Sequence, residues 1–274
     1  MRQRFIWLCL TIGLGLGVRP PACEAVNSRE FNGTTDLINF SRAAAVDDLG
    51  PLTACAWIKA AGTGENGFGR IVAKENTGAQ GAGQWNFFVT TGNVFRFAKD
   101  YSGGSDLARQ SGSNAFTVGS WTHGCVTWDD TAASTGINFY ANGTLTNSST
   151  SAAEGLGSQV SDAALSIIVG NRQNAERTFS GNIAYVHVFN RVLSVSEIQQ
   201  LMTQPDSVTS GLVFYADLQG VSPETDGSST GLSGTLTGTT VDTGDGPSIQ
   251  EAATCLSGWT RPRTWLRFAS ARLR

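Results

Sequence analysis

A strand, a sharp turn and a second strand are clearly marked between residues 118 and 143. In the first strand, alternation with period two places Trp121, His123 and Cys125 on one side. The second, aromatic strand runs into Asn142-Gly143, a pair that tolerates positive φ and favours a tight turn. This pattern predicts an antiparallel sandwich used for binding, and it contains no catalytic arrangement.

Further short strands follow one another at the spacing of about 8–12 residues that is typical of sandwiches. They are expected at 53–59, 70–74, 85–90, 93–98, 107–110, 121–128, 137–141, 165–170 and 182–189. Charged residues make up only 15% of the 274 residues, against about 25% in typical soluble domains, and there are 33 glycines. Many strands joined by polar turns, with almost no helical periodicity, predict an all-β fold.

One helix is clearly marked near residues 194–203. Ser194 and Glu197 have the spacing of a capping box, and Leu193 with Ile198 supplies the hydrophobic staple. We expect a single surface helix that covers part of the sandwich. The strand predicted next, over residues 211–218, is expected to return beside the first strand.

Several motifs occur in a fixed order between residues 27 and 205. They are Phe31-Asn-Gly33, Thr53-Ala-Cys-Ala-Trp-Ile-Lys59, Ile71 to Lys74, Gly119-x-Trp-x-His123, Phe139 to Gly143, Leu165 to Gly170, and Gly181 to Ile198. This order resembles the laminin-G-like or pentraxin-like branch of the concanavalin A-like lectin/glucanase superfamily. The closing strand departs from the family pattern, because Ile183-Ala-Tyr185 stands where relatives usually have Ile-Asp-Glu.

The resemblance implies an antiparallel two-sheet jelly-roll sandwich. It also implies core positions for Trp57 and Trp121 and a structural role for His123. Function on such a fold is loosely determined. The leading expectation is a non-enzymatic, lectin-like module for carbohydrate.

The first 25 residues are typical of a secretory signal peptide. Arg2 and Arg4 precede an apolar stretch, and Cys23-Glu-Ala25 is a small-residue cleavage site. A transmembrane helix needs about 20 apolar residues, and Arg19 ends this stretch too early, so we expect no transmembrane anchor. An uncleaved anchor is the alternative. The expected location is secreted or at the cell surface.

The jelly-roll domain is expected over residues 26–218. Residues 219–274 form a Gly/Ser/Thr-rich segment that ends in a basic tail, and up to about residue 247 this segment can belong to the fold. Residues 26–260 carry 11 basic and 21 acidic residues, a net charge of −10. Nucleic-acid binding depends on neutralising phosphates, so the acidic body argues against it.

Cys55 and Cys125 each lie inside a predicted strand. In an oxidising compartment the two would form a disulfide if their strands are neighbours. Two small, buried core residues are the alternative. For an exported chain we predict the bridge.

Calcium is the expected cofactor, because Asp and Asn oxygens in rim loops suit this hard cation. The candidate ligands are Asp47, Asp48, Asp129, Asp130, Asp100 and Asn171. Asp129-Asp130 is the first choice, since it directly follows the most clearly marked strand. The chain has only three lysines to offset such acids, Lys59, Lys74 and Lys99. A merely solvated turn is the alternative for each pair.

A sugar site needs an aromatic ring that is open to stacking and planar polar groups around it. The candidates are Trp85, Tyr101, Asn76, Asn171 and Arg172. If the two rings prove buried or dispersed, a protein-interaction or structural module of a cell-surface assembly becomes the better hypothesis.

Glycan cleavage is the third hypothesis and has little support. Some relatives use a Glu-x-Asp-x-x-Glu strand, with acids as nucleophile and general acid. The nearest string here, Glu224-Thr-Asp226, lacks the last acid. His123 and His187 alternate with apolar residues inside strands, which indicates structural histidines.

Overall fold

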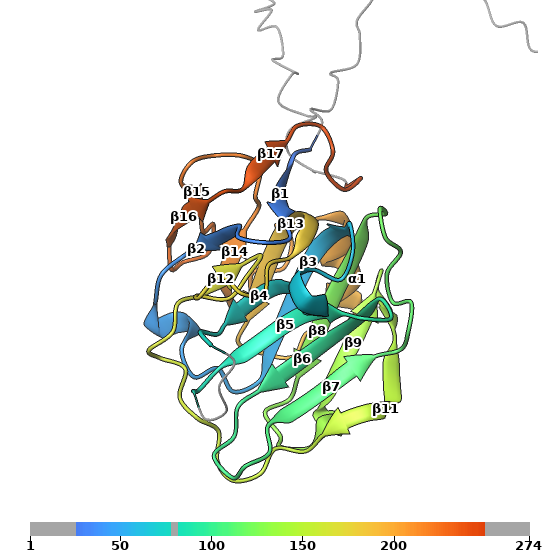
Figure 1. The fold of residues 1–274 in the computed structure, drawn as a ribbon, viewed down its shortest axis with the longest axis vertical. Coiled ribbons are helices and arrows are strands. Elements are labelled where there is room, and N and C mark those ends of the chain that lie inside the picture. Colours follow the sequence, from blue (N-terminus) through green and yellow to red (C-terminus); the bar gives the residue numbers. More distant parts are fainter. Residues whose placement is uncertain (1–25, 78–81, 250–274) are drawn as a thin grey trace, which may run out of the picture. The chain divides into compact units, whose positions relative to one another are not determined.

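Two antiparallel sheets face each other across a shared apolar core in the computed structural model of the protein, which describes residues 26–77 and 82–249 (Figure 1). The all-β sandwich is therefore confirmed. The expected signal peptide and the arginine-rich tail lie outside the described residues. No helix within the described residues has the length and apolar character needed to cross a membrane.

The first sheet has eight strands in the order β10-β9-β8-β3-β13-β1-β17, and β14 also pairs with β13. The strands are β1 (Ser28–Asn32), β3 (Leu52–Ala60), β8 (Thr122–Trp128), β9 (Ile137–Ala141), β10 (Thr144–Leu145), β13 (Ser180–Phe189), β14 (Leu212–Ala216) and β17 (Thr240–Asp242). Most of the predicted strands of this sheet are present to within two residues at each end.

Strand β13 pairs with three other strands of this sheet. One of its edges pairs with β3, and the other pairs first with β1 and then with β14. Tyr185, at a φ of 51°, lies between the β1 and β14 stretches. Strand β14 therefore continues along β13 where β1 stops, and the expectation that it would lie beside the first strand is wrong.

The second sheet has nine strands in the order β11-β7-β6-β5-β4-β12-β2-β16-β15. The strands are β2 (Leu37–Asn39), β4 (Arg70–Lys74), β5 (Trp85–Thr90), β6 (Val94–Lys99), β7 (Leu107–Ser111), β11 (Asn147–Ala153), β12 (Ile168–Val169), β15 (Glu224–Thr225) and β16 (Ser233–Thr237). Three short 3-10 helices lie between strands: η1 (Ala44–Val46), η2 (Glu65–Gly67) and η3 (Ser134–Gly136).

Strand β12 is shorter than the predicted strand over 165–170. Its C-terminal limit is set by Gly170, which has a φ of 78° and lies against Phe31; a Cβ there would be 2.0 Å from that ring. At its other end, the Leu165 amide donates to the Asp162 carbonyl in a turn. Only two residues therefore keep ladder geometry.

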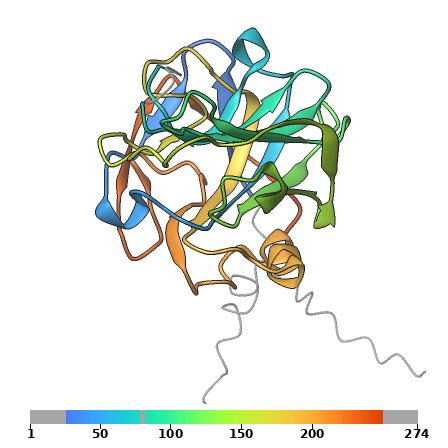
Figure 2. The ribbon, with the colours of Figure 1, turned by 90° about the horizontal axis from the view of Figure 1, so that it is seen from below.

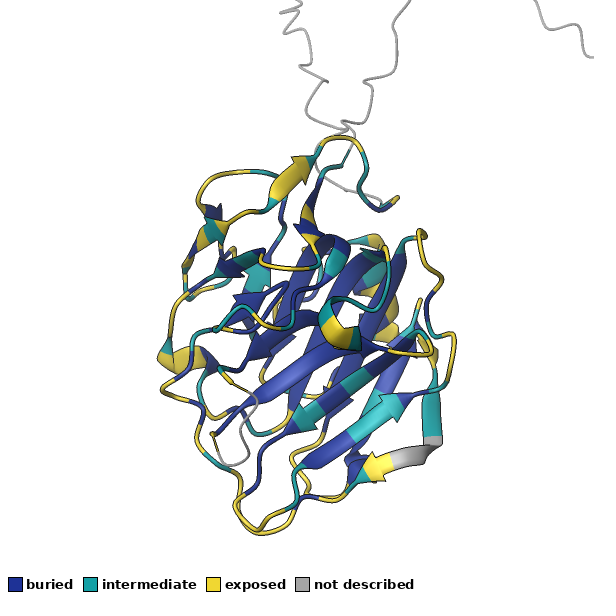
Figure 3. Ribbon diagram, viewed as in Figure 1, coloured by how far each residue is buried: buried dark blue, intermediate teal, exposed yellow. Residues whose placement is uncertain are grey.

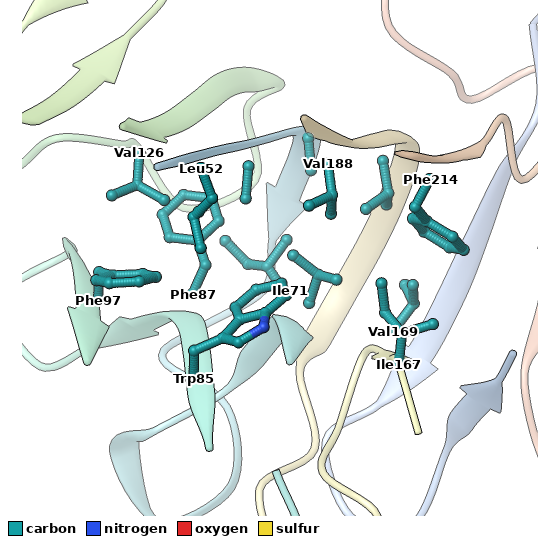
Figure 4. Packing of buried hydrophobic residues seen from close by; sticks show 14 of the residues in the cluster. Leu52, Ile71, Trp85, Phe87, Phe97, Val126, Ile167, Val169, Val188 and Phe214 are labelled. Carbon is teal, nitrogen blue, oxygen red and sulfur yellow. The ribbon is translucent and has the colours of Figure 1, made fainter. Parts of the chain in front are cut away.

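Apolar side chains from alternate positions fill the space between the sheets. Trp85, Phe87 and Val89 of β5 are fully buried, and they share one cluster with Leu52 and Val126 of the opposite sheet (Figure 4). Burying each large apolar side chain stabilises the fold by about 1.5–3 kcal/mol. This alternation leaves the intervening side chains of β5 on the outer face of the sheet.

Helix α1 (Val195–Thr203) confirms the predicted surface helix (Figure 2). Its capping box is formed, because Ser194 Oγ accepts from the Glu197 amide and the Glu197 carboxylate accepts from the Ser194 amide. The buried side chains of Ile198 and Leu201 pack in a cluster with Cys55 and Cys125. The helix thus covers part of the outer face of the eight-stranded sheet.

The two cysteines are bonded to each other, as predicted for an exported chain. Cys55 on β3 lies directly opposite Cys125 on β8, with the Cα atoms 4.1 Å apart. The bridge therefore joins two adjacent strands across 70 residues of sequence.

The segment after residue 218 adds strands to both sheets. Strand β16 pairs with β2, and β17 pairs with β1. A buried ion pair of 2.6 Å between Arg29 and Glu224 ties this segment to the first strand. The segment up to residue 242 is therefore part of the sandwich.

Candidate binding site

A cleft of about 260 Å³ opens over strands β4, β5 and β6. It lies on the outer face of the nine-stranded sheet, because Asn86 and Phe88 line it and alternate with the core residues Trp85 and Phe87. The lining residues are Phe68, Arg70, Glu75, Gln84, Asn86, Phe88, Arg96, Ala98, Asp100, Asp106, Arg172 and Arg177. Strands β4 and β5 beneath the cleft are buried, whereas β6 alternates between buried and half-buried residues (Figure 3).

A β-bulge directs Arg70 into this cleft. Arg70 pairs with Phe88 but Val72 pairs with Phe87, so one extra residue is inserted in β4. Ile71 and Val72 consequently both pack in the core. In a regular strand Arg70 would share the inward parity of Val72, and the bulge turns it outward instead.

Glu75 holds the floor of the cleft together. Its buried carboxylate accepts from Arg70 Nη2 at 2.8 Å and from Arg172 Nη1 at 3.3 Å, and Asn86 Nδ2 donates to it at 3.1 Å. Burial lowers the pKa of Arg70, although the Glu75 carboxylate acts in the opposite direction. Arg172 also pairs with Glu176 at 2.5 Å.

Arg96 is the exception in this network. Its guanidinium lies 5.9 Å from the centre of the Phe88 ring and, among the described residues, has no hydrogen bond or ion pair. Burial is the main cause that lowers the pKa of Arg96, and the like charge of Arg70 adds to it. The side chain is half-buried. A guanidinium with five donors and no acceptor is therefore available to a ligand.

In the cleft, the buried atoms Asn86 Oδ1 and Arg172 Nε also lack hydrogen-bond partners within the described residues. Phe68 is 37% exposed at the edge of the same cleft, and the Arg177 guanidinium lies 5.4 Å from the centre of its ring. The cleft thus offers an acceptor, several donors and an accessible aromatic ring.

Two acids form another wall. Asp100 accepts from the Gly83 amide at 3.1 Å, and Asp106 accepts from the Tyr101 amide at 3.0 Å. Burial, and secondly the charge of Asp106, raise the pKa of Asp100. Both carboxylates therefore already bind backbone amides.

The prediction that Trp85 and Tyr101 stack on a sugar ring is wrong. Trp85 is fully buried with its ring stacked on Phe97, because it shares the inward parity of Phe87 on β5. Tyr101 is 3% exposed and lies against Gly155, where a Cβ would be 2.7 Å from the ring. Neither ring offers a face to a sugar.

The polar candidates have separate roles. Arg172 lines the cleft as expected. Asn171 is fully buried and organises its own loop, donating to Thr178 Oγ1 at 2.6 Å and accepting from the Arg172 and Arg177 amides. Asn76 follows β4 but is not among the residues that line the cleft.

Lysines neutralise the acids at one rim. Lys74 pairs with Asp47 and, at 2.8 Å, with buried Asp162, and Lys99 reaches Asp162 at 3.1 Å. Asp48 accepts from the Asp162 amide and from Ser161 Oγ, which lowers the pKa of Asp48. The expectation that too few lysines offset this rim is therefore wrong, and charge repulsion does not argue for calcium there.

The exposed acids Asp129 and Asp130 lie in a different turn. Asp129 Oδ1 accepts from Thr131 Oγ1 at 2.7 Å, and Asp130 Oδ1 accepts from Gln159 Nε2 at 2.5 Å. Calcium binding at this pair stays a prediction.

Cys55, His123 and Cys125 form the one group of three His, Cys, Asp or Glu side chains in residues 26–77 and 82–249 that lie close enough to share an ion. The two sulfurs are already bonded to each other. The ring of His123 lies 5.3 Å from that of Trp57. A metal role for this buried group is therefore not supported.

Both histidines are buried strand residues. Burial lowers the pKa of His123 to about 3 and that of His187 to about 4. Glu224 and Asp226, the string nearest to a glycan-cleaving motif, are both buried away from the cleft residues and bind Arg29 and the Tyr215 amide respectively. These groups therefore serve the fold.

Sequence reasoning missed Arg70, Phe88 and Arg96. One signal was available, because Arg96 stands between the apolar residues Phe95 and Phe97 and must therefore face away from the core. The position of Arg70 depends on the bulge and could not be inferred from alternation.

The sequence matches one model of a known protein family. A family model, Laminin_G_3, described as the concanavalin A-like lectin/glucanases superfamily, matches residues 32–199. A search of curated protein sequences found no match.

Among solved structures, the chain is similar to a candidate carbohydrate-binding protein from Bacteroides ovatus, with a TM-score of 0.58 and 17% identity. That alignment covers 83% of this chain and 62% of the other, so the chain spans less than two thirds of that protein. A heptameric pentraxin from Limulus polyphemus gives a TM-score of 0.47 and 13% identity, over 80% of this chain and 95% of the pentraxin. Domains LG4-5 of the mouse laminin alpha1 chain give 0.40 and 13%, over 60% and 41%. At these identities the likeness concerns the fold alone.

Proposed function

Because the chain belongs to the concanavalin A-like lectin/glucanase superfamily and has a polar cleft on one sheet face, we propose that it is a non-enzymatic binding module for carbohydrate. The observation that carries the proposal is the set of unsatisfied polar groups in this cleft. Sugar hydroxyls both donate and accept, so they can pair with Asn86 Oδ1, Arg172 Nε and the Arg96 guanidinium. Such pairing would relieve the cost of leaving those buried groups unpaired.

The size of the cleft also suits a sugar. Its volume of about 260 Å³ is slightly below the range of about 300–1,000 Å³ that holds drug-sized ligands. The exposed part of the Phe68 ring supplies apolar surface at the edge. A single sugar residue, or the end of a chain, is the ligand that fits these dimensions.

The carboxylates in the cleft argue against glycan cleavage. Glu75 is neutralised by two arginines, and Asp100 and Asp106 each accept from a backbone amide. We therefore assign these acids to holding the cleft in shape. The disulfide suits an oxidising compartment, which supports secretion or display at the cell surface.

A protein-interaction module is the second candidate. The burial of Trp85 and Tyr101 favours it, because neither ring that was expected to stack on a sugar is accessible. In that case the arginines of the cleft would contact acidic groups of an extracellular protein.

A glycan array probed with residues 26–249, with calcium and then with EDTA, tests the proposal. Arg96→Ala should weaken binding of any positive glycan about tenfold or more, since hydrogen bonds to charged groups contribute about 1.5–3 kcal/mol. Phe68→Ala should also weaken binding, because the variant lacks the exposed ring at the edge of the cleft. Arg42→Ala is the matched control, because Arg42 is exposed and outside the cleft. If no glycan binds, or if the two cleft variants bind like the control, the carbohydrate proposal is wrong. Release of reducing ends from a bound glycan would instead indicate an enzyme.

A further inference from the structure

Positive charge is concentrated in the cleft. Between residues 26 and 260 there are 11 basic residues and a net charge of −10. Four of these 11 residues, Arg70, Arg96, Arg172 and Arg177, line this single cleft. The carboxylates of Glu75, Asp100 and Asp106 line the same cleft, so four guanidiniums stand against three carboxylates within a negatively charged body. A local excess of positive charge raises the local concentration of oppositely charged ligands.

Carboxylates neutralise some of the four arginines and not the others. Glu75 neutralises Arg70 and Arg172, and Arg172 has Glu176 in addition. Arg177 donates to the carbonyl oxygen of Glu176 and forms no ion pair among the described residues. Together with Arg96, two of the four guanidiniums therefore have no carboxylate partner in the described part of the chain.

The backbone of Arg96 is held in place by its strand. It stands on β6 between Phe95 and Phe97, whose rings are fully buried in the core, and it lies over Phe88 of the neighbouring strand. A planar guanidinium on a rigid strand can donate two parallel hydrogen bonds to a carboxylate or sulfate. Burial increases the strength of such a pair relative to one in water.

We infer that the ligand of the cleft is an acidic sugar, whose carboxylate or sulfate group binds to the Arg96 guanidinium. This inference rests on the proposed function and specifies the chemistry of its ligand. The small volume suits one charged sugar residue, with its ring near Phe68 and its hydroxyls near Asn86 and Arg172. Arg177, which has no carboxylate partner in the described part of the chain, adds positive potential beside Phe68.

Isothermal titration with matched ligand pairs tests the inference. One arm compares trigalacturonic acid with its methyl ester, and the other compares lactose 3′-sulfate with lactose, so the arms distinguish carboxylate from sulfate. A hexaglutamate peptide serves as an acidic ligand without a sugar. Each ligand is titrated into the wild type and into Arg96→Gln, Arg96→Lys and the control Arg42→Gln, which removes one positive charge outside the cleft.

The acidic member of at least one pair should bind about tenfold to a hundredfold more tightly than its neutral partner. Arg96→Gln should abolish this preference, Arg96→Lys should retain part of it, and Arg42→Gln should leave it intact. The preference should also shrink as salt is added, because screening weakens the ion pair. Melting curves of all variants confirm that each is folded.

The opposing outcomes separate the two ideas. If both members of a pair bind equally and Arg96→Gln weakens both, the cleft binds a neutral sugar, so the proposed function stands and the inference is wrong. An acid preference that Arg96→Gln and Arg42→Gln leave equally unchanged also refutes the inference. If hexaglutamate binds as tightly as the acidic sugars, the assigned ligand class is wrong. If an array of acidic and neutral glycans gives no binding, both ideas fail.

Discussion

Removal of the Cys55–Cys125 bridge should lower the stability of the sandwich by several kcal/mol. The bridge closes a loop of 70 residues, and in the chain-entropy model such a crosslink stabilises by about 4 kcal/mol. Both cysteines are fully buried in the cluster beneath helix α1. Replacing both with alanine also removes two buried sulfur atoms, which costs about 1 kcal/mol more in lost packing. The double variant should therefore be about 5 kcal/mol less stable than the wild type.

Equilibrium unfolding in guanidinium chloride measures this difference directly. A reductant breaks the bridge once the chain is unfolded, so it should lower the stability of the wild type by about 4 kcal/mol. It should not change the stability of the double variant, which has no bridge. In thermal melts the loss corresponds to about 10 °C or more for a domain of this size. A double variant within about 1 kcal/mol of the wild type would refute the reasoning, as would a wild type that is insensitive to reductant at equilibrium.

Three further predictions concern charge. Burial lowers the pKa of His187 to about 4 from its ordinary 6.5, so the unfolded chain binds the proton more readily. The contribution of His187 to stability is complete above pH 6.5 and roughly 3 kcal/mol of it should be lost by pH 4, while His123 adds a loss of the same sign. Urea unfolding between pH 4 and pH 8 measures this loss, and a profile that is no flatter in His187→Gln would contradict it. Glu75→Gln leaves two buried arginines without a shared carboxylate and should destabilise the fold by about 3–5 kcal/mol. The control Glu176→Gln, at a side chain that is 59% exposed, should change the denaturation midpoint little. Equal midpoints for both variants would argue against this role of Glu75. Calcium should raise the melting temperature by a few degrees over EDTA through Asp129 and Asp130, and identical melts would mean a solvated turn.

Much of the fold could be predicted from the sequence, because its signals are local. The capping box of Ser194 and Glu197 depends on residues three apart, and the turn at Asn142-Gly143 depends on two adjacent residues. Alternation within β5 and β8 is likewise a property of single strands. The pairing of β14 was predicted wrongly because a break at Tyr185 within β13 decides it, and local pattern does not reveal that break.

The cleft could not be predicted, because it is assembled from distant parts of the chain. Arg96 comes from β6, Arg172 from a loop about 76 positions later, and Arg70 faces outward only because of a bulge. Trp85 was misplaced although the parity of Phe87 already indicated that it points inward. Asp47 and Asp48 were candidate calcium ligands, and their actual partners could not be inferred because Lys74 and Asp162 lie far from them in the sequence.

Because β13 lies late in the chain, β1 is synthesised long before the strands that pair with it. Among the described strands, β1 pairs with β13 and β17 alone, which begin about 150 and 210 residues after it. At a synthesis rate of about 5–20 residues per second, β1 waits roughly 8–30 s for its first partner. Until then β1 has no hydrogen-bonded neighbour, and its unpaired edges can associate with other chains. Contacts so distant in sequence also predict refolding on the millisecond-to-second scale of sandwiches, so assembly of the domain is a step that follows synthesis of nearly the whole chain.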